Sequence, residues 1–323
     1  MKYFIGRRLV SSVGLIVGIT CFTFLLMHCC PGDFLTQVEA DPSIASKYVL
    51  SLKNKFGLDK PWYVQYFCWV KCLCRLDFGE SWIYNLPVLK LFQQRVGATI
   101  RLTLLALILG WMSAIPCAIL AATYAHSLWD KTMRFLAYLF LSLPEFFLAL
   151  LGIFFAAKTG LFPIMGKTSI EYDFLAPSQQ IVDTLQHLLL PACILSLNIF
   201  AHIFRITRNC YLDNLHAEYV RVAQAKGVSS WTLLFKHVLR NTFNPLISHF
   251  GFAFAGLLSG ALLVENVFNY PGLGQLLFEA FMAKDQYVVM GAVVIGSCML
   301  ILGNLLADIL LCFNDPRLRT ILR

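Results

Sequence analysis

Few residues in this sequence could perform chemistry, and the best match to a nucleotide-binding pattern is incomplete. Gly166, Lys167 and Thr168 resemble the end of a phosphate-binding loop. That loop requires a further glycine five positions before Gly166, where residue 161 is leucine. We therefore expect no ATP site on this chain.

Metal and hydrolase chemistry are equally unsupported. His28, His187 and Glu279 stand singly, without the H-x-x-x-H or H-E-x-x-H spacing of a zinc site. The sequence has no G-x-S-x-G pattern and no plausible Ser/His or Asp/Asp pair inside an apolar stretch. We expect no catalytic residue, no bound metal and no cofactor on this chain.

One carboxylate, Glu145, lies beside Pro144 near the middle of a predicted membrane span at 135–158. A carboxylate at bilayer depth is costly and usually faces a partner or a water-filled path. Pro144 should also kink the helix. Glu145 is therefore either a pore-lining residue or a group at the end of a span whose register differs from the one predicted.

A second carboxylate, Glu265, ends another apolar stretch and is followed by Pro271, Gly272 and Gly274. Proline and glycine at these positions predict a tight turn, and Glu265 should be buried or nearly so. The segment is either a simple connection or a re-entrant element that narrows the external mouth of a pore.

The segment Glu218–Gly227 is polar, basic and rich in small residues, although the rest of the chain is largely apolar. It predicts a short helix that ends at Gly227, because glycine adopts a positive φ without a steric penalty. Ser229 or Ser230 would cap a second short helix. The predicted apolar face of the first helix consists of Leu215, Tyr219, Val222 and Ala223.

The composition is that of a membrane protein: of 323 residues, 58% are hydrophobic and 14% are charged. The mean hydropathy is +0.68. The net charge of +8 does not indicate nucleic-acid binding, because the basic residues mostly flank apolar stretches.

Apolar stretches predict an all-α polytopic membrane protein with six transmembrane helices. These lie at about 9–28, 101–124, 135–158, 187–205, 246–266 and 288–312. Lysine and arginine are concentrated at the ends and in the loop 206–245, so the positive-inside rule places both termini and this loop in the cytoplasm.

The first span is followed by a long amphipathic insert at 30–98, which we expect on the external side. We therefore predict two parts: residues 1–98 hold the first span and this insert, and residues 99–323 hold the remaining spans and the loop 206–245. The insert contains Cys68, Cys72 and Cys74, whose spacing fits no zinc site and leaves a disulfide open.

Taken together, these residues resemble the permease subunits of bacterial ABC importers for dipeptides, oligopeptides and nickel. The resemblance covers nearly the whole chain. Its markers are Arg7-Arg8, Pro31-Gly32-Asp33, the segments 56–66 and 77–81, Pro87-Val88, Ala98-Thr99, Ser142-Leu143-Pro144, His187 with Pro191, Tyr219–Gly227, His237–Asn241 with Pro245, Pro271–Gly274 and Asp315–Arg317.

The resemblance implies a function for the basic segment. In such permeases this loop forms coupling helices that seat in a cleft of the ATPase subunit. The residues that would do so here are Glu218, Tyr219, Arg221, Ala223, Ala225, Lys226 and Gly227. Arg221 and Arg240 stand where the broader importer pattern has Glu and Pro, which suits the peptide subgroup, whereas Glu145 departs from the small hydroxylated residue that is usual there.

The family also implies the partners: a second homologous permease, two ABC ATPase subunits that bind ATP and Mg²⁺, and a periplasmic or extracellular solute-binding protein. The chain would be a subunit of a peptide importer in the bacterial inner membrane and no enzyme itself. Pro144, Glu145, Glu265, Pro271, Gly272 and Gly274 are the pore or gate candidates. Nickel import and an ion-coupled secondary transporter that uses Glu145 remain alternatives.

Overall fold

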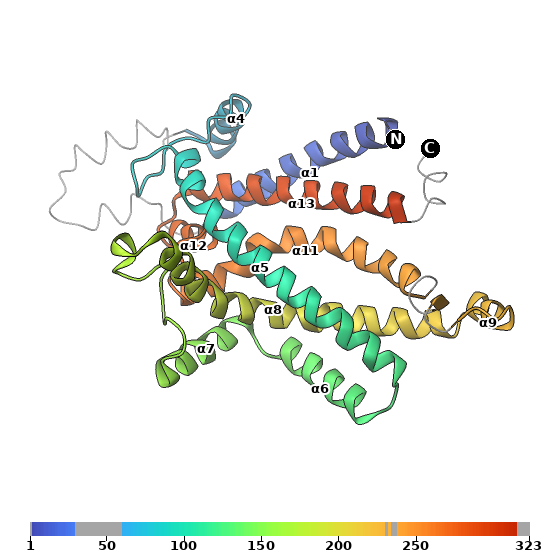
Figure 1. Cartoon of the computed structure of the whole chain (residues 1–323). Helices are drawn as coiled ribbons and strands as arrows, with labels where there is room; N and C mark the ends of the chain where they lie inside the picture. The colour runs from blue at the N-terminus through green and yellow to red at the C-terminus, as the bar shows by residue number, and fades with distance from the viewer. Residues whose placement is uncertain (1, 30–59, 230–231, 234–237, 315–323) are drawn as a thin grey trace. The chain divides into compact units, whose positions relative to one another are not determined.

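The computed structural model describes residues 2–29, 60–229, 232–233 and 238–314, and these residues are overwhelmingly helical (Figure 1). Residues 31–33, 56–59, 237 and 315–317, on which parts of the resemblance rest, lie outside the described residues, as does Ser230, a predicted helix cap. The helices are α1 (Lys2–Cys29), α4 (Trp62–Leu73), α5 (Val88–Thr123), α6 (Leu128–Ser142), α7 (Glu145–Thr159), the short 3-10 helix η1 (Tyr172–Phe174), α8 (Pro177–Leu215), α9 (Glu218–Ala225), α11 (Leu239–Val267), α12 (Leu273–Met282) and α13 (Gln286–Asn314).

Among the described residues, four helical segments are long and apolar enough to cross a membrane: Ser11–Cys29, Val88–Thr123, Pro177–Leu215 and Gln286–Leu311. The helices α6 and α7 pass the same test only as a bent pair, which would raise the number to five. A helix is also present at the predicted span 246–266, inside α11. The all-helical fold is therefore confirmed, whereas the count of six spans stays a prediction.

The predicted span at 135–158 is not one continuous helix. The chain breaks after Ser142 and turns by 103° between α6 and α7. Leu143 is extended, with ψ 129°, because a residue that precedes proline is disfavoured in the helical region. The predicted kink at Pro144 is confirmed, but Glu145 is the first residue of α7 and does not lie in the middle of a helix.

The predicted span at 187–205 is much shorter than the helix that contains it. α8 has 39 residues and continues through Pro191. It begins at Pro177, where the missing N–H of proline costs nothing, and the side chain of Gln179 accepts the N–H of Ala176 at 3.2 Å. Pro191 therefore does not end α8.

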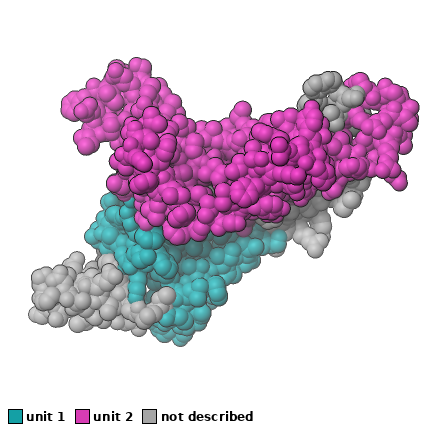
Figure 2. Space-filling model, turned by 90° about the horizontal axis from the view of Figure 1, so that it is seen from below, with its two compact units in different colours: residues 1–97, 272–299 teal, residues 98–271, 300–323 magenta. Residues whose placement is uncertain are grey.

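The chain forms two compact units, residues 1–97 with 272–299 and residues 98–271 with 300–323, coloured teal and magenta in Figure 2. Two of their three boundaries fall inside α5 and α13, and the third falls between α11 and α12. The predicted division into 1–98 and 99–323 stays a prediction.

In the first unit, α4 packs against α1. Tyr66 and Trp69 are buried. The hydroxyl of Tyr66 lies 3.1 Å from Thr20 Oγ1 and donates to the carbonyl of Val17 at 3.2 Å. The ring of Phe24 stands edge-on to Tyr66 at 5.5 Å. The amphipathic pattern of the insert is thus explained by contact with the first helix.

The connection between α4 and α5 is fixed by Asp285, which is fully buried just before α13. Its Oδ2 accepts hydrogen bonds from Ser81 Oγ at 2.6 Å and from the backbone N–H groups of Trp82 at 2.8 Å and Ile83 at 3.3 Å. Its Oδ1 accepts the N–H of Val288 at 3.4 Å, which caps the first turn of α13.

A second contact joins the connection between α4 and α5 to α12. The hydroxyl of Tyr84 donates to Glu279 of α12 at 2.5 Å. Burial, and then this hydrogen bond, raise the pKa of Tyr84 to about 12. Tyr84 therefore keeps its proton at physiological pH and remains the donor in this contact.

The second unit has its core between α5, α7, α8 and α11, where Leu102, Ala149, Ala192 and Val264 are buried. α8 packs against α6, α7 and α11. Gly110 of α5 has no room for a larger residue, because a Cβ there would lie 2.7 Å from the side chain of Ile199. Since α8 packs against α6, α7 and α11 and lies close to α5 at Gly110, it is the central helix of this unit.

We expect Asp285→Ala to lower the stability of the purified protein by about 3 kcal/mol, because several donors to one buried carboxylate lose their acceptor. Thermal unfolding in detergent measures the effect. Asp285→Asn, which keeps one acceptor oxygen, should lose less. The matched control is the exposed Asp173→Ala, which should leave the transition unchanged; an equal loss in both alanine variants would contradict this role of Asp285.

Candidate functional site

The predicted coupling segment forms the helix α9, which follows the end of α8 after a two-residue connection (Figure 1). The connection is held by the hydroxyl of Tyr219, which donates to Asn214 Oδ1 at 2.8 Å. The α9 helix therefore has a fixed attachment to the last turn of α8.

The end of α9 confirms the role predicted for Gly227. Its φ is +75°, a value that favours glycine. The N–H of Val228 donates to the carbonyl of Ala223 at 3.2 Å, and the N–H of Gly227 donates to that of Gln224 at 2.9 Å. This pair of bonds is the Schellman arrangement that closes a helix, and Val228 packs in the same cluster as Ala223.

The apolar face predicted for this helix is half right: Leu215 and Ala223 pack against a buried cluster, but Tyr219 and Val222 do not. Val220 is the fully buried residue of α9, and it packs in a cluster with Ala122, Tyr211 and Val238. Tyr219 is 38% exposed and Val222 is 55% exposed. Leu215 is the last residue of α8 and not part of α9, so the helical spacing counted from it does not give the buried positions of α9.

The outward face of α9 is a mixture of charged and small apolar side chains. At 100° per residue, the positions opposite Val220 and Ala223 are Glu218, Arg221, Val222 and Ala225, and all four are exposed. Lys226 and Gly227 are exposed directly after them. We call Glu218, Arg221, Val222 and Ala225 the α9 outer face.

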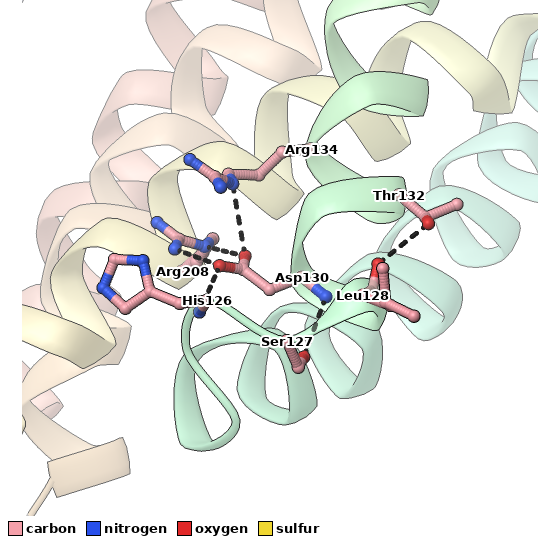
Figure 3. Close-up of polar contacts among 7 residues, drawn as sticks. All are labelled: His126, Ser127, Leu128, Asp130, Thr132, Arg134 and Arg208. Atoms are coloured by element: carbon pink, nitrogen blue, oxygen red, sulfur yellow. Dashed lines mark hydrogen bonds and ion pairs between the residues drawn. The ribbon is translucent and has the colours of Figure 1, made fainter.

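A buried ion pair joins α6 to α8 near the attachment of α9 (Figure 3). Asp130 is fully buried, and Arg208 donates to both of its oxygens, from Nε to Oδ1 at 2.6 Å and from Nη2 to Oδ2 at 2.8 Å. Arg134 Nε lies 3.4 Å from Oδ1.

The same carboxylate also organises the start of α6. The backbone N–H of His126 donates to Asp130 Oδ2 at 3.0 Å, and the N–H of Asp130 donates to Ser127 Oγ at 3.2 Å. Two arginines and a backbone donor thus surround one buried carboxylate. We call Asp130, Arg134 and Arg208 the α6–α8 clamp.

Glu145 pairs with a polar residue of α8. Its Oε1 accepts a hydrogen bond from Asn198 Nδ2 at 2.8 Å, and it is half-buried at the start of α7. One turn further along α8, the ring of His202 lies 6.0 Å from the ring of His249 of α11. Pro144 lies directly before Glu145. The side chains of Glu145, Asn198, His202 and His249 thus come from three helices, α7, α8 and α11.

Glu265 is fully buried, as predicted, and accepts a hydrogen bond from Thr99 Oγ1 at 2.6 Å. Its carbonyl accepts the N–H of Tyr270 at 2.8 Å, which turns the chain after α11. Gly272 is extended at the start of α12, and Gly274 is buried within that helix. The predicted turn is present; a role in a gate stays a prediction.

The cysteines of the insert do not pair in the described part of the chain, where Cys68, Cys72 and Cys74 are free and exposed. No group of three or more His, Cys, Asp or Glu side chains that could hold a metal is found among the described residues.

The sequence patterns do not identify three residues that form key hydrogen bonds in the structure: Asp130, Asn198 and Asp285. Asp130 four residues before Arg134 is a pattern visible in the sequence, but its stronger partner, Arg208, is remote in the chain. Their pairing is a tertiary contact.

Comparison with known proteins covers the full length of the chain. Residues 114–320 match the family described as binding-protein-dependent transport system inner membrane component, and residues 1–103 match the N-terminal region of such membrane components. The chain is 35% identical over 320 residues to the oligopeptide transport system permease protein AppB of Bacillus subtilis, covering 98% of this chain and 99% of that protein.

A second relative is the dipeptide transport system permease protein DppB of Escherichia coli, which is 33% identical over 337 aligned positions, with 99% of each chain covered. The family match extends over the helices α6 to α13, including α9 and the α6–α8 clamp. The chain belongs to the family of binding-protein-dependent transport system inner membrane components.

Proposed function

We propose that this chain is the transmembrane permease subunit of an ATP-driven importer of dipeptides or oligopeptides, and that it forms half of the translocation path. The observation that carries this proposal is the full-length similarity to permeases whose names specify oligopeptide and dipeptide transport. The helices that are long and apolar enough to cross a membrane support it. The chain would lie in the inner membrane with both termini in the cytoplasm.

The α9 outer face is the proposed contact with an ATPase subunit. Ala225 and Gly227 carry little or no side chain, so a partner can approach the backbone closely, while Glu218 and Arg221 can orient the encounter. Val222 would provide the apolar centre of the contact. Because Val220 anchors the helix from the opposite side, a force on this face is transmitted to α8.

The α6–α8 clamp extends this connection to a second helix. Two hydrogen bonds from one arginine to one carboxylate constrain both the distance and the orientation of the helices. Breaking a buried ion pair on one side is costly, so α6 and α8 should move together. ATP hydrolysis on two partner ATPases would thereby move the wall of the path.

The remaining partners follow from the same function: a second, homologous permease to complete the path, and a periplasmic or extracellular solute-binding protein to deliver the peptide. An ion-coupled transporter that uses Glu145 is not favoured, because the relatives are named as permeases of peptide transport systems. Nickel import is less favoured for the same reason.

We expect Val222→Asp to reduce the amount of ATPase that co-purifies with a tagged chain by at least tenfold, because an unpaired charge would be buried at the contact (~1.4 kcal/mol or more). Co-purification in detergent followed by ATPase assay measures this. The control Gln224→Asp adds the same charge on the flank of α9. Equal loss in both variants, or no ATPase with wild type, would argue against the α9 outer face.

We expect Asp130→Ala to destabilise the protein by about 3–5 kcal/mol, because Arg208 keeps its charge without a partner. Thermal unfolding of the purified chain tests this. The double variant Asp130→Asn with Arg208→Gln should recover part of the loss, since it removes both charges. If the double variant is less stable than Asp130→Ala, the ion pair is not the source of the effect.

The same variants test the mechanical role. In the reconstituted importer, Asp130→Asn should lower the peptide imported per ATP hydrolysed, because α6 no longer follows α8. Asp173→Asn, at an exposed carboxylate, is the control and should transport normally. If Asp130→Asn imports as much peptide per ATP hydrolysed as wild type does, the α6–α8 clamp does not transmit movement.

A further inference from the structure

One face of α8 is polar along a stretch of three helical turns. Asn198, His202, Arg205 and Asn209 follow one another at spacings of four, three and four residues, which places them on one side of the helix. The side chains of His202, Arg205 and Asn209 are exposed in the single chain, and Asn198 is half-buried. We call these four residues the α8 polar face.

The opposite side of α8 is part of the core. Ala201, Ile203 and Phe204 are almost completely buried, in a cluster that includes Leu246 of α11. The rotational position of α8 is therefore fixed by packing. The polar side chains cannot turn inward to find partners.

Neighbouring helices add polar groups to this face. Glu145 reaches it from the start of α7 through its hydrogen bond with Asn198. His249 reaches it from α11 and lies against His202. The helices α7, α8 and α11 pack against one another in pairs. The side chains of Glu145, Asn198, His202 and His249 therefore belong to one packed arrangement within the second unit.

When Glu145 is ionised, its surroundings compensate its charge only partly. Asn198 offers one neutral donor, and no cation of the described residues forms an ion pair with Glu145. A carboxylate so close to apolar helices needs either water or a cationic partner. An aqueous path along the α8 polar face would supply such partners, whereas lipid offers no hydrogen bonds.

The charges along the face have an order. Glu145 lies at the level of Asn198, and Arg205 is seven residues further along α8, roughly 10 Å along the helix axis. Arg205 is held over the ring of Tyr138 at 5.8 Å. A short extended peptide has its ammonium and carboxylate groups separated by a comparable distance, about 10 Å for three residues.

We infer that Glu145, oriented by Asn198, receives the cationic amino terminus of a peptide on the translocation path, and that His202 and His249 hydrogen-bond the peptide backbone one helical turn further along. This inference rests on the proposed function and names a binding site within it. The site uses groups that all unmodified peptides share. Amide and imidazole side chains both donate and accept hydrogen bonds, so they suit a peptide backbone whatever its side chains.

The test uses the complete importer in liposomes, with the partner permease, the ATPases, the binding protein and radiolabelled trialanine. Glu145→Gln keeps the size and the acceptor for Asn198 but removes the charge. Initial uptake should fall about tenfold. Glu145→Asp should retain more uptake than Glu145→Gln, and Glu171→Gln, at an exposed carboxylate, should not change it.

Uptake by the wild-type importer separates this inference from the proposed function. If wild type imports trialanine and Glu145→Gln does so equally fast, the site is refuted and the importer is not. If uptake by the Glu145→Asp importer falls as far as uptake by the Glu145→Gln importer, the negative charge does not bind the peptide, and the inference is again refuted. Without uptake by wild type, it is the proposed function itself that fails.

A labelling measurement tests the location without relying on rates. His202→Cys should react with a water-soluble maleimide in the assembled importer, and trialanine should slow the reaction during turnover. Phe154→Cys, at an apolar position that is 65% exposed, is the lipid-facing control and should stay unreactive. Mass spectrometry of the modified peptide distinguishes these sites from the native cysteines. If His202→Cys is as unreactive as the control, the α8 polar face is covered by lipid or by the partner permease, and the inference is wrong.

Discussion

A carboxylate among apolar helices must find its partners within the protein or in a water-filled path, and the fold depends on how this requirement is met. Asp130 is held by two arginines, Asp285 by a hydroxyl and backbone N–H groups, and Glu265 by at least one threonine hydroxyl. Apart from Arg134, which is four residues from Asp130 in the same helix, these side-chain partners are remote in sequence. Glu145, in contrast, has a neutral amide as its partner, which marks it as a group that can act on something else.

The second unit is built around α8, because this helix carries contacts of every kind. Its apolar side packs against α6, α7 and α11, Arg208 binds Asp130, and Asn198 binds Glu145. At its end it is joined to α9, whose Val220 is buried and whose outer face is exposed. A single helix of 39 residues thus joins the proposed peptide site to the proposed ATPase contact.

The break between α6 and α7 creates the setting for Glu145. A continuous helix would satisfy the backbone at residue 145 internally and place this side chain on a helical surface. Pro144 instead ends the ladder of hydrogen bonds and starts a new helix in another direction. The carboxylate thereby comes within hydrogen-bond distance of α8. The same bend leaves Asp130 at the far end of α6, so the two carboxylates contact different parts of α8.

Hydropathy and local chemistry were enough to predict an all-helical membrane protein, the helical segment after the first span, the kink at Pro144, the burial of Glu265 and the end of α9 at Gly227. These features depend on neighbours in sequence or on average polarity. The continuation of α8 through Pro191, the buried face of α9 and the partners of Asp130, Asp285 and Glu145 were decided by tertiary structure. The physical reason is that burial and ion pairing depend on which helix lies opposite. That choice results from packing over the whole core, which a local pattern does not contain.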